Sequence, residues 1–141
     1  MSMFKKTVII GTGLIGGSLG LALRRKRLVA QVTGFSRHKR NAILAKKSGA
    51  IDCIGSSLDA VKDADLVVLS MPPEAIISTA AKISKKINRE CIVIDVGSSK
   101  EKIVSRLSRL IPNFVGCHPL AGSEKRGISN LASGIFNNTI C

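Results

Sequence analysis

The sequence predicts an α/β domain in which helices cover both faces of a mostly parallel, doubly wound sheet. Two observations lead to this fold class. Short β-branched, apolar runs alternate with longer helical segments along the chain. The runs are apolar almost throughout rather than at every second residue, which is typical of strands buried on both faces. With 141 residues, the chain is long enough for one such core.

Each element follows from its local sequence. The first strand is expected at residues 7–10 (TVII), and the helix 14–25 follows a glycine-rich turn. A second strand (29–35) and helix (39–48) repeat the alternation, followed by a short strand (51–54) and a short helix (58–62). The strand 66–69 (LVVL) precedes the helix 74–85, the strand 91–94 precedes the helix 100–110, and a strand at 113–116 completes the series.

Composition narrows the class of protein. The chain is 45% hydrophobic and 22% charged, as folded domains are, and no apolar run approaches the roughly 20 residues of a membrane span. Its first residues lack a signal peptide's long apolar segment, which predicts a cytoplasmic protein. Lysine and arginine outnumber acidic residues by 22 to 9, a net charge of +13. A solvated basic surface, a polyanionic partner or a phosphate-rich ligand would each account for this charge.

The cysteines and histidines point to no metal chemistry. Cys53, Cys91, Cys117 and Cys141 form no CxxC pair, and we expect buried, reduced thiols, in keeping with a cytoplasmic protein. With two histidines and no cluster at metal-ligand spacing, the sequence predicts no metal site.

A glycine-rich turn joins the first expected strand to the first expected helix. Residues 11–18 read GTGLIGGS, and GxGxxG between a strand and a helix is a strong signal for a dinucleotide site. Gly11 permits the tight turn, Gly13 lets the backbone approach a pyrophosphate, and Gly16 lets the helix pack closely on the strand. The start of the helix, with Leu14 and Ile15, offers free N–H groups to the phosphates. We therefore expect residues 1–141 to form a Rossmann-type dinucleotide-binding domain.

The end of the second expected strand favours NADP over NAD. A NAD site usually has an acidic residue about 20 residues after the glycine turn, where it binds the ribose 2′-hydroxyl. No acidic residue precedes Asp52; Ser36 stands at the expected position and Arg37 follows it. A hydroxyl and a guanidinium suit a 2′-phosphate, and Lys39 and Arg40 could add charge. A plain basic loop is the alternative interpretation.

Polar residues also follow the ends of three later strands, where doubly wound sheets bind ligands. Ser70 and Pro72 close the strand 66–69 and are expected near the cofactor. Ser98 follows the fifth strand, and His118 follows the last. An imidazole with a pKa near 6.5 is largely neutral at pH 7 and can accept a proton, so His118 is the predicted catalytic base. Its neighbour Cys117 should point to the opposite face of the strand, which argues against a thiol nucleophile.

Three segments together resemble the prephenate dehydrogenase family, which includes the arogenate and cyclohexadienyl dehydrogenases. They are GTGLIGGS at 11–18, DVGSSK at 95–100 and GCHPLAG at 116–122, in the family's order and spacing. The stretch HPLAGSEKRG at 118–127 is the most specific, because other Rossmann dehydrogenases share only the glycine turn.

The resemblance implies oxidative decarboxylation of prephenate to 4-hydroxyphenylpyruvate, or of arogenate to tyrosine, in tyrosine biosynthesis. By this analogy, His118 takes the proton of the ring hydroxyl while hydride leaves the same carbon for the nicotinamide. Ser98 would orient the hydroxyl, His118 or the nicotinamide. The residues expected to bind the small-molecule substrate are Ser98, His118, Ser123, Glu124 and Lys125.

The family also has a helical second domain that forms a homodimer and supplies an arginine to the substrate. The last six residues, FNNTIC, resemble a turn and a strand that has only begun. We therefore expect this domain to be incomplete in its last strand and the helical domain to be absent. The choice between prephenate and arogenate stays open.

Three other functions fit parts of the sequence. A β-hydroxyacid or imine reductase shares the glycine turn, but such enzymes commonly place a catalytic lysine in a later helical domain. A basic nucleic-acid-binding protein fits the charge and would bind DNA with a steep salt dependence, but the aromatic content of 3% opposes a base-stacking surface. A cofactor-binding sensor would not need Ser98 and His118 at its strand ends.

Overall fold

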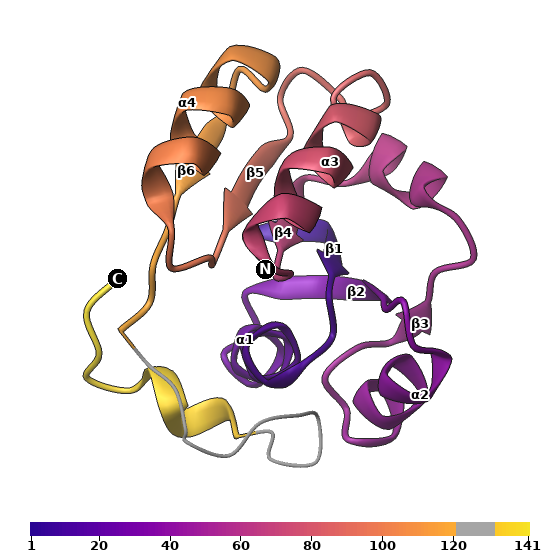
Figure 1. Cartoon of the computed structure of the whole chain (residues 1–141). Helices are drawn as coiled ribbons and strands as arrows, with labels where there is room; N and C mark the ends of the chain where they lie inside the picture. The colour runs from indigo at the N-terminus through magenta and orange to yellow at the C-terminus, as the bar shows by residue number, and fades with distance from the viewer. Residues whose placement is uncertain (121–131) are drawn as a thin grey trace.

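The computed structural model describes residues 1–120 and 132–141, which form a central sheet with helices on both faces (Figure 1). Within these residues, six parallel strands make one sheet in the order β3-β2-β1-β4-β5-β6. The strands are β1 (Phe4–Ile10), β2 (Val29–Phe35), β3 (Cys53–Ile54), β4 (Leu66–Leu69), β5 (Ile92–Asp95) and β6 (Phe114–Gly116). The helices are α1 (Leu14–Arg25), α2 (Lys39–Lys47), α3 (Pro73–Ile83) and α4 (Lys100–Leu110), with 3₁₀ helices η1 (Leu58–Asp63) and η3 (Ser133–Phe136). The predicted α/β class and parallel sheet are confirmed.

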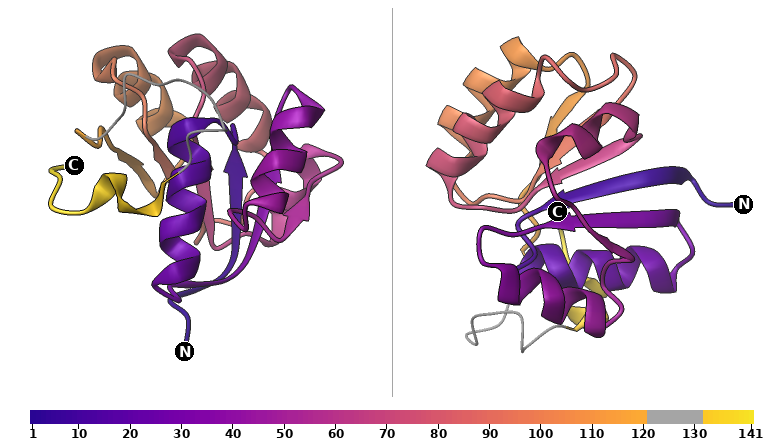
Figure 2. Two further views of the ribbon diagram at one scale, coloured as in Figure 1. Left: turned by 90° about the horizontal axis from the view of Figure 1, so that it is seen from below. Right: turned by 90° about the vertical axis from the view of Figure 1, so that its right-hand side faces the viewer.

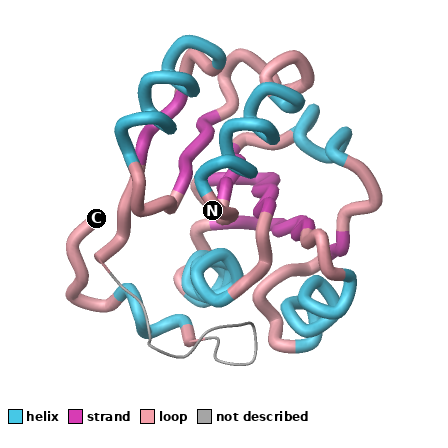
Figure 3. The backbone as a smooth tube through the Cα atoms, in the orientation of Figure 1, coloured by secondary structure: helices cyan, strands magenta, loops and turns pink. Residues whose placement is uncertain are grey.

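The strand order reverses at β1. The chain moves outward from β1 through β2 to β3, returns to the other side of β1 as β4, and continues to β5 and β6. Helices α1 and α2 cover one face, and α3 and α4 cover the other, as Figure 2 and Figure 3 show from different sides. Because the strands are parallel, their carboxyl ends meet along one edge. The crevice at the reversal point, between β1 and β4, is where such sheets bind ligands.

Most predicted elements form where they were expected. Helices 14–25 and 100–110 and strands 29–35 and 66–69 have the predicted bounds, and most others shift by one or two residues. The first strand begins earlier than predicted, at Phe4. Its early residues pair with β2, and the backbone N–H groups of Lys5 and Lys6 donate to the carboxylate of Asp65 at 2.7 and 2.9 Å.

The connection between β2 and β4 differs more from the prediction. The strand expected at 51–54 is reduced to β3, and Ile51 lies before it, almost completely buried in the core. The next residue, Asp52, accepts a hydrogen bond from the N–H of Val32 at 2.8 Å and pairs with Arg24 at 2.8 Å. The helix expected at 58–62 forms as the 3₁₀ helix η1.

The expected start of a strand at the end of the chain is not formed. Residues 137–138 make the predicted turn, with Asn138 in the left-handed region at φ 56°, but residues 139–141 belong to no strand. Instead, the N–H of Leu120 donates to the carbonyl of Ile140 at 2.8 Å. Just before this turn, η3 packs on α1, and the buried hydroxyl of Ser18 accepts a hydrogen bond from the N–H of Ala132 at 3.2 Å.

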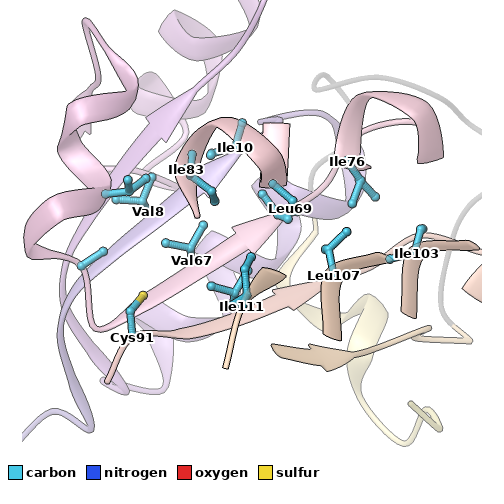
Figure 4. Close-up of a cluster of buried hydrophobic side chains, with 14 residues drawn as sticks. Val8, Ile10, Val67, Leu69, Ile76, Ile83, Cys91, Ile103, Leu107 and Ile111 are labelled. Atoms are coloured by element: carbon cyan, nitrogen blue, oxygen red, sulfur yellow. The ribbon is translucent and has the colours of Figure 1, made fainter. Parts of the chain in front are cut away.

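The core consists of two clusters of buried side chains, one on each face of the sheet. Adjacent strand residues point to opposite faces, so Val8 and Val67 belong to one cluster while Ile9 and Val68 belong to the other. The cluster beneath α3 and α4 is shown in Figure 4, where the two helices contribute Ile76, Ile83, Ile103 and Leu107. Both faces of the central strands are therefore buried from solvent, as their continuous apolar sequences predict.

Truncation of a core isoleucine should cost far more than truncation of an exposed one. Ile76 of α3 is fully buried, whereas Ile43 of α2 is 37% exposed. We expect Ile76→Ala to lower the free energy of unfolding by about 2–5 kcal/mol, because it removes buried methyl groups and leaves a cavity. The matched control Ile43→Ala should change it by less than about 1 kcal/mol. Urea unfolding followed by circular dichroism measures both; equal losses would contradict this assignment of the core.

Candidate dinucleotide and catalytic site

The glycine turn brings the start of α1 against the ends of β1 and β4. Gly11 has φ +99°, a conformation that favours glycine, and a Cβ atom there would lie 2.0 Å from the carbonyl oxygen of Ser70. A Cβ atom at Gly16 would lie 2.0 Å from the carbonyl oxygen of Gly11. In contrast, a Cβ atom at Gly13 would have no neighbour within 4 Å. The protein's own packing therefore requires Gly11 and Gly16, whereas Gly13 leaves open space for a ligand.

The N-terminus of α1 suits an anion. The first N–H groups of a helix have no partner within the helix, and no side chain caps them here. The first turn contains no acidic residue. The hydroxyl of Thr12 is buried in the same turn without a hydrogen-bond partner among the described residues. Free amides, an unpartnered hydroxyl and a positive helix end together fit the pyrophosphate of a dinucleotide.

A cavity of about 570 Å³ opens beside this turn, at the carboxyl ends of β1, β2 and β4. Its volume lies in the range typical of small-molecule sites. Six of the predicted cofactor-binding residues line it: Gly11, Gly13, Ser36, Arg37, Ser70 and Pro72. The other three, Leu14, Ile15 and Gly16, do not line the cavity. They form the first turn of α1, so a ligand would meet them at the backbone N–H groups of that turn.

The sequence interpretation missed the side chains that the later elements add. Phe35, His38, Asn41, Leu58, Met71, Glu74, Ala75 and Thr79 also line the cavity. Glu74 and Thr79 come from α3, and Leu58 comes from η1. Proximity to a strand end was a usable signal for His38 and Met71. No local signal identifies Leu58 or Thr79, because only the packing of η1 and α3 brings them to the cavity.

The loop after β2 contributes three polar side chains to the cavity. Ser36, Arg37 and His38 line the cavity there, and the hydroxyl of Ser36 accepts a hydrogen bond from the N–H of His38 at 3.3 Å. Lys39 and Arg40, which were expected to add charge, belong to the first turn of α2 and do not line the cavity. Among the described residues, the one carboxylate that lines it is Glu74.

Ser98 and His118 lie at a second position on the same edge, beyond β5 and β6. These strands are neighbours, and Asp95 pairs with Gly116 at the end of their ladder. Both Ser98 and His118 are exposed, and neither side chain has a hydrogen bond within the described parts of the chain. The sheet therefore brings the two predicted catalytic residues to adjacent strand ends. Ser123, Glu124 and Lys125 lie outside the described residues.

The cysteines are less buried than predicted. All four are free, but only Cys91 is buried; Cys53 and Cys117 are partly exposed and Cys141 is exposed. Desolvation by burial raises the pKa of the Cys117 thiol to about 11, with the neighbouring Cys141 thiol contributing. A protonated thiol is a poor nucleophile, so Cys117 is unsuited to covalent catalysis at neutral pH. No group of three or more metal-ligating side chains occurs in the described part of the chain.

Substitutions at Gly13 and Gly16 should affect different properties, ligand binding and folding stability respectively. Gly13→Ala should leave the unfolding midpoint nearly unchanged, because the added methyl group enters open space. The same methyl group should weaken NADPH binding by about tenfold or more, since a loss of 1.4 kcal/mol suffices for tenfold. Gly16→Ala should instead destabilise the fold itself. Fluorescence titration with NADPH and urea unfolding distinguish the two, and normal NADPH binding by Gly13→Ala would contradict a pyrophosphate site at this turn.

Comparisons with known proteins agree with this geometry. Residues 19–141 match the family model of the prephenate dehydrogenase nucleotide-binding domain. The prephenate dehydrogenase of Bacillus subtilis is 33% identical over 144 residues, an alignment that covers 98% of this chain and 39% of that protein. The chain therefore spans about two fifths of the length of this relative.

Solved structures of the same family superpose closely. Prephenate dehydrogenase from Aquifex aeolicus, in complex with hydroxyphenyl propionate and NAD+, has a TM-score of 0.89 and 31% identity, covering 96% of this chain and 48% of that one. Synechocystis arogenate dehydrogenase has a TM-score of 0.88 and 32% identity, with coverage of 95% and 48%. The family model matches from the middle of α1 onward, and the sequence relative and the structures cover nearly the whole chain. The chain therefore belongs to the prephenate dehydrogenase family, as a nucleotide-binding domain of that family.

Proposed function

We propose that this chain is the nucleotide-binding part of an NAD(P)-dependent dehydrogenase that decarboxylates prephenate to 4-hydroxyphenylpyruvate, or arogenate to tyrosine. The observation that carries the proposal is the glycine turn with its open space at Gly13, on the same sheet edge as Ser98 and His118. A dinucleotide extended along this edge would run from the cavity at β1, β2 and β4 toward β5 and β6. The named activities of the relatives support the same reaction class.

Different residues of the chain would bind the cofactor and transfer the proton. The start of α1 would hold the pyrophosphate, and the loop after β2 would hold the adenosine ribose. A bound nicotinamide supplies the hydride acceptor. His118 would accept the proton of the substrate's ring hydroxyl as hydride leaves the ring carbon that bears this hydroxyl. The ring carboxylate then departs as CO2, and its bonding electrons enter the ring, which becomes aromatic. The ketone oxygen left by the oxidation becomes the phenol oxygen and takes back a proton, and Ser98 would orient the hydroxyl or the imidazole.

His118→Asn should separate chemistry from cofactor binding. Asparagine keeps hydrogen-bonding capacity but cannot act as a base near neutral pH. In the native-length protein, we expect kcat with prephenate or arogenate to fall by about 10²–10⁴-fold, the usual contribution of general-base catalysis. NADPH binding, measured by fluorescence titration, should stay unchanged. Turnover close to that of the unmodified protein would overturn the role of His118.

We also propose that NADP is preferred to NAD. Support comes from Ser36 and Arg37, which line the cavity where a NAD site usually has a carboxylate. Glu74 lines the same cavity from α3, on a different element from the usual acidic residue. The Aquifex aeolicus structure contains NAD+, so this preference would set the present chain apart from that relative.

Arg37→Ala tests the cofactor preference. It should weaken NADPH binding by about tenfold or more, since a hydrogen bond to a charged group contributes about 1.5–3 kcal/mol, and should change NADH binding much less. Arg40→Ala is the matched control: it removes the same charge from a residue that does not line the cavity. Titrations with NADPH and NADH at fixed salt measure both variants. Equal losses for the two cofactors would refute a 2′-phosphate contact.

The cellular setting and assembly belong to the same proposal. No helix in the described part of the chain is long and apolar enough to cross a membrane. We propose a cytoplasmic enzyme that acts on a small-molecule substrate as a homodimer. Size-exclusion chromatography with light scattering on the native-length protein tests the dimer.

A further inference from the structure

Asp95 is the one fully buried acidic residue in the described part of the chain, and the proposed reaction does not use it. It is the last residue of β5, and its side chain is completely inaccessible to solvent. Burial of a carboxylate is costly unless the charge is paired and its oxygens accept hydrogen bonds. Both requirements are met: Lys100, the first residue of α4, donates from its ammonium group to Oδ2 of Asp95.

The two oxygens of Asp95 hold two separate backbone segments. Oδ2 accepts from the N–H of Gly97 at 2.9 Å, and Oδ1 accepts from the N–H of Cys117 at 3.3 Å. Gly97 directly precedes Ser98, and Cys117 directly precedes His118. The β5–β6 ladder ends at the pair Asp95 and Gly116, so the side chain of Asp95 continues the link where the sheet stops. One carboxylate therefore ties together the two segments that carry the predicted catalytic residues.

The surroundings leave these segments little freedom. A Cβ atom at Gly97 would lie 3.0 Å from Ile103 and 3.2 Å from Oδ2 of Asp95. One at Gly116 would lie 2.8 Å from Val104, with the stem of Lys100 at 3.7 Å. The backbone on both sides of the carboxylate is thus packed against α4, whose first residue supplies the ammonium group.

We propose that the Asp95–Lys100 pair is a positioning device for the dehydrogenase reaction, holding Ser98 and His118 at a set separation through the N–H groups of their preceding residues. This inference rests on the proposed function. An ionised carboxylate is required because both backbone contacts and the lysine are donors; an asparagine amide would turn its own donor toward one of them. Lys100 keeps the buried charge neutralised, so the carboxylate stays in place during turnover.

The test compares Lys100→Met, Lys100→Arg and the control Lys102→Met in the native-length protein. Lys102 is exposed on the same helix. We expect Lys100→Met to lower kcat by about 10²-fold, the effect of a displacement of about 1 Å, while NADPH affinity is unchanged. Lys100→Arg should restore most of kcat, and Lys102→Met should have no effect. If Lys100→Met does not fold, the double variant D95N/K100M, which removes both charges together, takes its place.

Histidine NMR on the 141-residue chain gives a readout that does not require turnover. The chain has only two histidines, His38 and His118, so their ring signals are easily assigned. Loss of the pair should shift the signals of His118 and leave those of His38 unmoved, while Lys102→Met should move neither.

The possible results distinguish failure of the positioning role from failure of the proposed function. If the unmodified protein turns over neither prephenate nor arogenate, the proposed function fails, and the positioning role fails with it. If the unmodified protein is active and Lys100→Met keeps its kcat and its His118 signals, the positioning role alone is refuted. In a variant that stays folded, a loss of kcat matched by an equal loss of NADPH binding would also refute it, by showing a general structural role.

Discussion

The close approach of α1 to the ends of β1 and β4 is the contact on which the rest of the structure depends. At Gly11 and Gly16 the neighbouring backbone is so near that no side chain fits. This contact sets the helix end directly over the reversal point of the sheet. The free amides of α1, the open space at Gly13 and the cavity beside them all follow from it. A bulkier turn would move the helix away and remove the anion site together with the tight packing.

The carboxyl edge of the sheet carries two candidate sites that are held together by different interactions. The cavity at β1, β2 and β4 is formed by packing, with glycines, apolar side chains and a basic loop around open space. The ends of β5 and β6 are instead held by charge, through one buried carboxylate and one lysine. Packing suits a site that must accept a large ligand, whereas a hydrogen-bonded carboxylate suits a site whose small groups must keep their positions during a reaction.

In this strongly basic chain, the five aspartates make contacts that stabilise the fold. Each of the five aspartate carboxylates accepts from a basic side chain, a backbone N–H, or both, and several tie distant segments together. Asp52 joins α1 to β2, and Asp65 holds the start of β1. At Asp59, hydrogen bonds from Lys86 and Lys62 lower the pKa of the carboxyl. The aspartates thus serve the fold, and the excess of basic over acidic residues gives the chain a positive charge, which favours the approach of phosphate-bearing ligands.

The sequence by itself determined the elements and the glycine turn, because both depend on neighbours along the chain. Apolar runs mark buried strands, and the spacing of Gly11, Gly13 and Gly16 matches one strand–turn–helix geometry. It also indicated Ser36, Arg37, Ser98 and His118, since residues just after strands of a parallel sheet must lie at its carboxyl edge. Only the tertiary structure decided the rest. Leu58 and Thr79 reach the cavity through the packing of η1 and α3, and Asp95 reaches a second segment because β6 runs beside β5 and presents the N–H of Cys117. These contacts join residues distant in sequence, and no local pattern encodes which of them meet.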